Sequence, residues 1–329
     1  MASRDWISLR ISSFDMKRFL IKLVFIAAPA ALAAALACGI SMLQDGKGEP
    51  NYQRGFVYQV RALEKADPNV PKVLFIGGSY LTFSMDEKTA CEMLPMPSYC
   101  LGVNSGMGMC YVFEMAKRFV RKDDLIVFPF DAFAKADYGM PLIYLSLRAE
   151  PDLQQDFFLH HPFLVLSSIA PYCFHRWVAR LGPLLRGNKP KSPGYSPKCF
   201  NPENGFYNLE RTSKWDRSRL GLPFGFTIDA IDPTCFEVLN DFDAFCRGKG
   251  ARFVLAHSPI IEDAVSSSPA ELEKYDHDLA MRLTAPVIMP RSDSLFHADF
   301  IYDFPKHLTS AGAVMYTRKL CECIKQRVR

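Results

Sequence analysis

The sequence lacks the strong charge imbalance that is typical of nucleic-acid-binding proteins. Its 329 residues carry a formal net charge of only +4, and no basic stripe with interleaved aromatic side chains is present. We therefore expect no nucleic-acid partner. The chain also lacks a phosphate-binding loop and a dinucleotide-binding glycine signature, so no cofactor is predicted. No internal repeat is apparent.

The sequence has no paired C-x-x-C motifs, although its ten cysteines are many for this length. Cys321-x-Cys323 alone is weak evidence for metal binding, so we predict no metal site. If the domain is exported, Cys91 and Cys100 could close a short disulfide loop. The alternative is that most of the cysteines are small core residues.

A long uncharged segment is present near the N-terminus. Residues 23–43 contain no formal charge, which is long enough for a helix to cross a hydrocarbon core of roughly 30 Å. We predict a cytoplasmic N-terminus over 1–18 and a transmembrane signal anchor over 19–43, because Arg and Lys residues crowd the N-terminal side. The alternative is a cleaved signal peptide, since Ala35-Leu36-Ala37 before Cys38 resembles a small-residue cleavage site. Under the favoured interpretation the protein is single-pass, with its main domain periplasmic or extracellular.

The rest of the chain predicts an α/β domain. Residues 44–70 are expected to form a tether and an entry helix, and 71–329 the folded domain. Short, nearly continuous apolar runs at 72–78, 99–103, 124–131, 251–258 and 286–290 are typical of parallel strands covered on both faces. Helical patterns follow at 110–121, 233–247 and 310–327. This alternation predicts a three-layer α/β/α, doubly wound, flavodoxin-like sheet, interrupted by an insertion at about 132–230 that covers the site.

The stretch KVLFIGGSYLTFSM, residues 72–85, places Ser79 directly after a predicted strand. In a doubly wound sheet, functional side chains gather at the carboxyl ends of the strands, so Ser79 is a candidate nucleophile. Among seven histidines, His307 is the preferred base, because it precedes the last predicted helix in FIYDFPKHLTSAG. Asp303 is close enough to orient its ring. The structural alternative makes Ser79 a turn residue, Asp303 a cap and His307 a satisfied polar group.

Three motifs together resemble a known superfamily. FIGGSY, GVNSGMGM and YDFPKHLTSAG resemble, in order, the first, second and last blocks of the SGNH (GDSL-like) hydrolases. More narrowly, the chain is similar to the membrane-anchored, exported branch associated with membrane-bound O-acyltransferases, including the SGNH-like proteins of D-alanyl-teichoic acid biosynthesis. NPENGFYNLERTSKW, residues 201–215, is also similar to that branch's glycine-containing insertion.

The resemblance implies roles for individual residues. Ser79 would be the nucleophile, His307 the general base and Asp303 its orienter. The Ser79 N–H and a glycine N–H after the second strand would stabilise the oxyanion, with Gly108 preferred over Gly106, which follows Asn104.

Two positions depart from the superfamily pattern. Asp131 stands after the third strand, where the third block normally supplies an oxyanion-hole asparagine, and a carboxylate would repel an oxyanion unless it is protonated or turned away. The last block normally reads D-x-x-H, whereas three residues separate Asp303 from His307. Asp299 is therefore a fallback orienter.

These observations favour an exported, membrane-tethered esterase or O-acyltransferase that acts on small, acetyl-like groups of an envelope polysaccharide. Its expected partners are a membrane-bound O-acyltransferase and the glycan or acyl donor. The second hypothesis is a non-catalytic SGNH scaffold that holds a polymer or the acyltransferase. A third is a membrane-anchored binding domain in which the motif matches are coincidental.

Overall fold

The computed structural model describes residues 52–327 apart from 133–134, 148–149, 170, 174, 176–194 and 214, together with residues 18, 21, 22, 24, 25 and 28. The chain divides into two compact units. One comprises Glu49–Phe157 and Ser192–Arg329, and contains the predicted site; the other comprises Met1–Gly48 and Phe158–Lys191. Within the second unit the structure describes a short helix, α8 (Pro162–Leu164), followed by a π-helical turn, Val165–Ile169.

The first unit is built on a parallel four-stranded sheet of order β2-β1-β3-β4. The strands are β1 (Val73–Ile76), β2 (Ser98–Leu101), β3 (Leu125–Phe130) and β4 (Arg252–His257). β1 and β3 are buried along their whole length, because the sheet is covered on both faces. All four carboxyl ends therefore meet at one edge.

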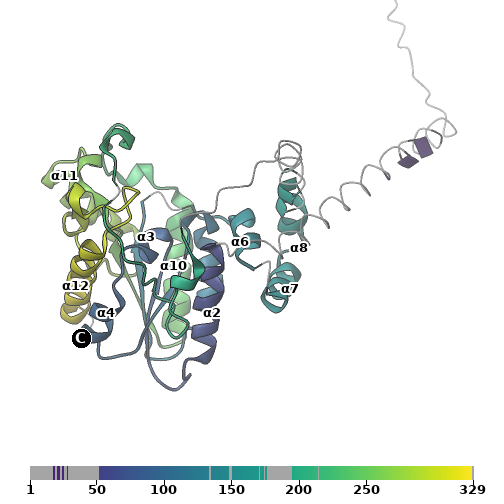
Figure 1. Cartoon of the computed structure of the whole chain (residues 1–329), viewed down its shortest axis with the longest axis horizontal. Helices are drawn as coiled ribbons and strands as arrows, with labels where there is room; N and C mark the ends of the chain where they lie inside the picture. Colours follow the sequence, from purple (N-terminus) through teal and green to yellow (C-terminus); the bar gives the residue numbers. More distant parts are fainter. Residues whose placement is uncertain are drawn as a thin grey trace, which may run out of the picture. The chain divides into compact units, whose positions relative to one another are not determined.

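Helices cover both faces of this sheet, as Figure 1 shows. α5 (Met109–Lys117) packs on α10 (Pro233–Gly248) through Phe113 and Phe242, whose ring centroids are 4.3 Å apart, and α2 (Gly55–Lys65) contacts α5 through Phe56 and Tyr111. On the other side, the backbone N–H of Asp86, which caps α4 (Glu87–Met93), donates to the Thr317 hydroxyl of α12 (Ser310–Arg327). The unit is therefore an α/β fold with helices on both sides of a parallel sheet.

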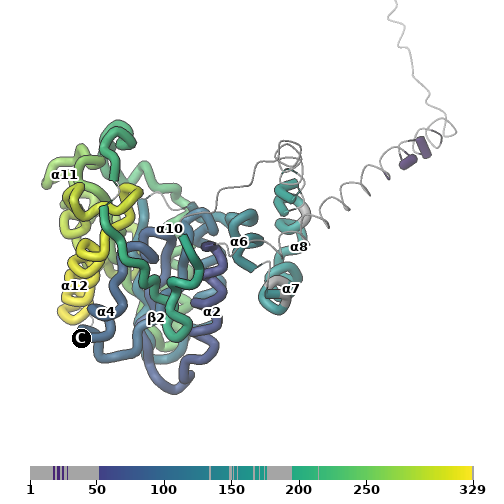
Figure 2. The backbone as a smooth tube through the Cα atoms, viewed as in Figure 1, coloured from purple at the N-terminus to yellow at the C-terminus, as the bar shows by residue number. Residues whose placement is uncertain are grey.

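The segment 195–213 lies beside β2, between α4 and α2 (Figure 2). The N–H of Cys100 donates to the carbonyl of Asn204, and the buried Gln59 of α2 donates to the carbonyl of Gly205. Glu87 of α4 accepts hydrogen bonds from the side-chain amides of three asparagines, Asn201, Asn204 and Asn208. The segment is therefore fixed to the sheet and to helices of both faces.

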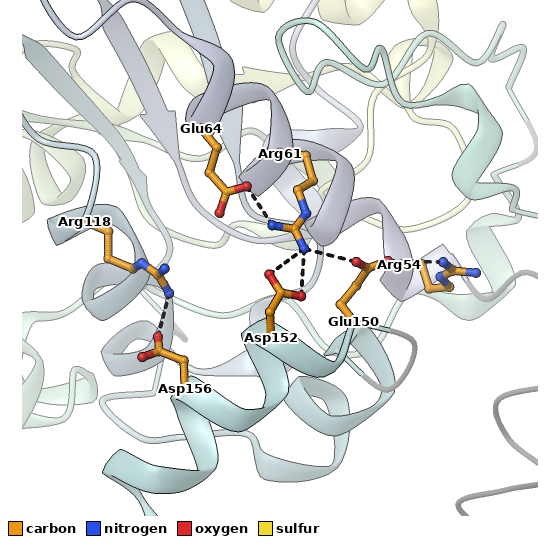
Figure 3. A network of polar contacts seen from close by, with 7 residues as sticks. All are labelled: Arg54, Arg61, Glu64, Arg118, Glu150, Asp152 and Asp156. Carbon is orange, nitrogen blue, oxygen red and sulfur yellow. Dashed lines mark hydrogen bonds and ion pairs between the residues drawn. The ribbon is translucent and has the colours of Figure 1, made fainter.

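Within the first unit, ion pairs join the segment 150–156, which includes the start of α7 (Pro151–His160), to residues in and beside α2 and α5 (Figure 3). Arg61 of α2 contacts Glu64 and Asp152, each at 2.7 Å, and Glu150 at 3.2 Å. The other pairs join Arg118 to Asp156 at 2.8 Å and Arg54 to Glu150 at 3.5 Å. Single exposed pairs contribute little stability, but this network shares one arginine among three carboxylates.

Four of the five predicted strands are confirmed, and the last predicted helix is found at Ser310–Arg327. The fifth prediction was wrong in part, because only an isolated parallel bridge joins Val287 to Leu255 in the segment 286–290. The possible Cys91–Cys100 disulfide is not formed: both are free thiols, with Cys100 buried and Cys91 exposed.

The N-terminal predictions fall largely outside the described residues. This applies to the cytoplasmic segment 1–18, most of the anchor 19–43 and the tether before Tyr52. None of the helices in the described part of the chain is both long and apolar enough to cross a membrane.

Candidate active site

Ser79 is the first residue of a short helix, α3 (Ser79–Thr82), that follows β1 after Gly77 and Gly78. It is half-buried at the carboxyl edge of the sheet, where the sequence placed it. Because it opens the helix, its backbone N–H has no acceptor within that helix. The hydroxyl and the N–H of one residue are thus presented at the same turn.

Gly78 allows the turn that bears Ser79 to contact the turn after β2. A Cβ atom at position 78 would lie 2.7 Å from the backbone nitrogen and 2.8 Å from the Cα of Ser105. No side chain fits at that distance from backbone, so glycine is required by close approach. Gly77, Gly78, Ser105 and Gly108 accordingly line one small cavity of about 20 Å³.

His307 and Asp303 form a hydrogen-bonded pair in the turn before α12. Nδ1 of His307 lies 3.0 Å from Oδ1 of Asp303. The turn is closed by two backbone hydrogen bonds, from Tyr302 N to the His307 carbonyl and from His307 N to the Phe304 carbonyl. The extra residue in the D-x-x-x-H spacing is therefore absorbed within a closed turn, and the carboxylate still reaches the ring.

The ring of His307 stacks on Phe83, one turn of chain after Ser79. The ring centroids are 4.3 Å apart with 30° between the planes, and the Ser84 hydroxyl donates to the Lys306 carbonyl at 3.3 Å. These contacts bring the turn of the predicted base against the turn of the predicted nucleophile. The two turns are more than 200 residues apart in sequence.

The protonation state of His307 suits a base. Burial lowers the pKa of its imidazole below the ordinary value, although the hydrogen bond to Asp303 opposes that shift. With Nδ1–H donated to Asp303, the lone pair is on Nε2, which is buried and has no hydrogen-bond partner among the described residues. Ser79 Oγ is therefore not hydrogen-bonded to Nε2 in this conformation, and apo catalytic contacts are often longer than those in a substrate complex.

The predicted oxyanion glycines are placed differently from the expectation. Gly106 N donates to the Asn104 side chain at 2.9 Å, and Gly108 N donates to the Ser105 carbonyl at 3.1 Å. Glycine is required at position 108 for two reasons. Its φ is +83°, and a Cβ atom there would lie 2.0 Å from the Asp137 carbonyl oxygen. Both glycine donors are thus engaged within their own turn. Asn104 accepts this hydrogen bond through Oδ1, so its amide nitrogen is not used in that contact.

Asp131 is paired with Lys306. It follows β3 directly, and both carboxylate oxygens contact Lys306 Nζ, at 2.6 and 2.8 Å. Asp299, the fallback orienter, lies elsewhere, because its carboxylate contacts His297 Nδ1 at 3.1 Å and is 84% exposed.

The structure contains a second histidine–aspartate pair that the sequence analysis did not predict. Nε2 of His257, the last residue of β4, lies 2.6 Å from Oδ1 of Asp276 on α11 (Pro269–Arg282). His257 is only 1% exposed, so a substrate cannot reach it without rearrangement. The signal for α11 itself was present, since Ser268 and Glu271 form a capping box.

Other site chemistries find little support in the described residues. No group of three His, Cys, Asp or Glu side chains in this part of the chain is placed to hold a metal ion. A cavity of about 470 Å³ lies at the opposite edge of the sheet, lined by Val73, Leu125 and Arg252, which begin their strands. Sites in open parallel sheets form at the carboxyl edge, so this larger cavity does not coincide with the predicted site.

Comparisons with known proteins give no match, whether to protein-family models, to curated proteins or to solved structures.

Proposed function

We propose that the chain is a serine acyl-ester enzyme of the SGNH type, an esterase or O-acyltransferase that acts on small acyl groups of an envelope polysaccharide. The observation that carries the proposal is the environment of His307: its Nδ1 lies against Asp303, its ring stacks beside the Ser79 turn, and burial lowers the pKa of the imidazole. An oriented histidine beside a serine turn supports a general base for the serine hydroxyl.

The chemistry follows from these positions. His307 Nε2 would take the proton as Ser79 Oγ attacks the ester carbonyl, and the Ser79 N–H with the Asn104 amide would stabilise the oxyanion. Collapse of this intermediate would expel the alcohol, with the proton returned from Nε2, and leave an acyl-enzyme. Water or a sugar hydroxyl would then accept the acyl group by the same steps in reverse.

The proposal extends to the cellular setting. The α/β sheet with helices on both faces is compatible with the flavodoxin-like SGNH fold, and the uncharged segment 23–43 supports a membrane tether with the domain outside the cytoplasm. A membrane-bound O-acyltransferase is the proposed partner.

A non-catalytic SGNH scaffold is the second candidate. Two observations favour it: the N–H groups of Gly106 and Gly108 are both engaged, and Ser79 is not hydrogen-bonded to His307. A scaffold of this kind would bind the glycan or the acyltransferase without turning over an ester.

The two candidates differ in one measurement. The purified full chain should hydrolyse p-nitrophenyl acetate and react covalently with a fluorophosphonate probe at Ser79. Ser79→Ala should lower the hydrolysis rate by at least about 100-fold and abolish labelling, because the nucleophile is lost. Ser292→Ala, at an exposed serine, is the matched control and should behave as wild type.

Adding a hydroxylated oligosaccharide would separate transfer from hydrolysis, with acetylated sugar measured by mass spectrometry. Equal rates and no labelling for folded wild type and Ser79→Ala would leave the scaffold as the better candidate.

A further inference from the structure

The contact between Asp131 and Lys306 joins two segments of the candidate site. Asp131 directly follows β3 and its side chain is 7% exposed, and Lys306, 15% exposed, immediately precedes His307. Both carboxylate oxygens lie within 2.8 Å of the ammonium group. The turn that holds the base is therefore fixed to the carboxyl end of a central strand.

The pair is mostly removed from water, so its two charges depend on each other. Removing one partner of such a pair leaves an uncompensated charge and costs more than removing both. Asp131 also acts through space on the fully buried Arg291, whose charge its carboxylate favours. The carboxylate after β3 thus lies near two cations, and its charge is not presented alone to an oxyanion.

The charges that act on His307 come from two segments, its own turn and the segment 195–213. Asp303, on its own turn, favours the imidazolium; Arg211, from the segment 195–213, and Lys306 disfavour it. The aromatic ring of Phe83, from the end of α3, contributes contact without charge. Asp131 affects His307 through Lys306, because its negative charge offsets the positive charge of Lys306.

We propose that the Asp131–Lys306 pair positions the catalytic base: it clamps the His307 turn to β3 and cancels a positive charge beside the imidazole. The inference rests on the proposed serine-ester function. In the SGNH pattern, the residue after the third strand donates to the oxyanion. In this chain, Asp131 at that position would instead hold the base in place.

Opposite single substitutions should move the base in opposite directions. Asp131→Asn leaves Lys306 uncompensated, which disfavours the imidazolium, so the acidic limb of kcat/KM should move to lower pH. Lys306→Met removes a positive charge beside the ring and leaves the Asp131 carboxylate without its Lys306 contact, which favours the imidazolium, so the limb should move to higher pH. Each shift should be about 0.5 in pH, with an about tenfold loss of kcat from the loosened turn.

Two further variants test positioning directly. The double variant Asp131→Asn/Lys306→Met removes both charges, and its limb should return close to the wild-type pH. Lys306→Arg keeps the cation and its two contacts, and should retain most of kcat. Lys319→Met, at a partly exposed cation on α12, is the control and should leave the limb in place.

The experiment has two readouts on the purified full chain. One is the pH profile of p-nitrophenyl acetate hydrolysis, and the other is NMR titration of the His307 ring, assigned with His307→Gln. The NMR readout needs no activity, so opposite His307 shifts without Ser79-dependent hydrolysis would support the pair and overturn the proposed function.

Ser79-dependent hydrolysis with shifts that are absent, or equal in sign for both single variants, would overturn the pair and leave the function standing. If Lys306→Met does not fold, the pKa of the His307 ring is compared between Asp131→Asn and the double variant. The inference expects the lower pKa in Asp131→Asn. A pKa that is equal or higher there would overturn it.

Discussion

Three residues separate Asp303 from His307, and the closed turn between them decides whether the carboxylate can orient the ring. We expect Asp303→Asn to lower kcat by about 100-fold with little change in KM, because the amide can present its N–H₂ to Nδ1 and favour the wrong tautomer. The effect should be smaller than for a fully buried orienter, since the Asp303 side chain is 24% exposed.

The measurement is the steady-state rate of acetyl-ester hydrolysis for Asp303→Asn beside Asp299→Asn. The control changes an exposed aspartate that contacts His297 and should keep the wild-type kcat. An unchanged kcat in Asp303→Asn would show that the hydrogen bond does not orient the base.

At the scale of elements, Glu87 connects α4 to the segment 195–213 by accepting from three asparagine amides. Glu87→Gln replaces one acceptor oxygen with a donor and removes the charge, so at least one amide loses its partner. We expect the free energy of unfolding to fall by about 1–2 kcal/mol. Denaturant unfolding measures it, and Glu92→Gln on the same helix, in a loose exposed pair with Lys88, should change it by less than about 0.5 kcal/mol. Equal losses in both variants would remove the special role of Glu87.

The sequence predicts elements better than it predicts contacts. Apolar runs identify four strands because burial on both faces leaves a continuous pattern, and Thr309 followed by Ser310 marks the start of α12. The run at 286–290 fails because it meets Leu255 at a single bridge.

The contacts of the site need the fold. Lys306, which pairs with Asp131, is 175 residues away in the sequence. The local sequence therefore shows only a carboxylate that would be unfavourable beside an oxyanion. The engaged N–H of Gly108 likewise depends on the path of the turn, which the glycine pattern does not specify.

At the scale of the whole molecule, two buried histidines link stability to pH. Burial lowers the pKa of both His307 and His257 below the ordinary value near 6.5. Between 6.5 and the lowered values, the unfolded chain binds protons that the folded chain does not, so stability falls as pH falls through this window. Above 6.5 both rings are neutral in either state and contribute no slope.

We therefore expect the free energy of unfolding to be flat with respect to these groups above pH 6.5, and to decrease below it by up to about 1.4 kcal/mol per pH unit for each histidine. Denaturant unfolding at closely spaced pH values from about 8 to 5 measures the slope. His257→Gln should lower stability at every pH, because Oδ1 of Asp276 loses its contact with the imidazole. It should also reduce the slope below pH 6.5 by the contribution of one histidine. Ser292→Ala, at an exposed serine that does not titrate in this range, is the control and should leave the slope as it is. The slope is the informative quantity, since a packing defect lowers the whole curve without changing how many protons unfolding takes up.

A wild-type slope that is absent between pH 6.5 and 5, or that survives in full in His257→Gln/His307→Gln, would show that these rings are not held neutral by the fold.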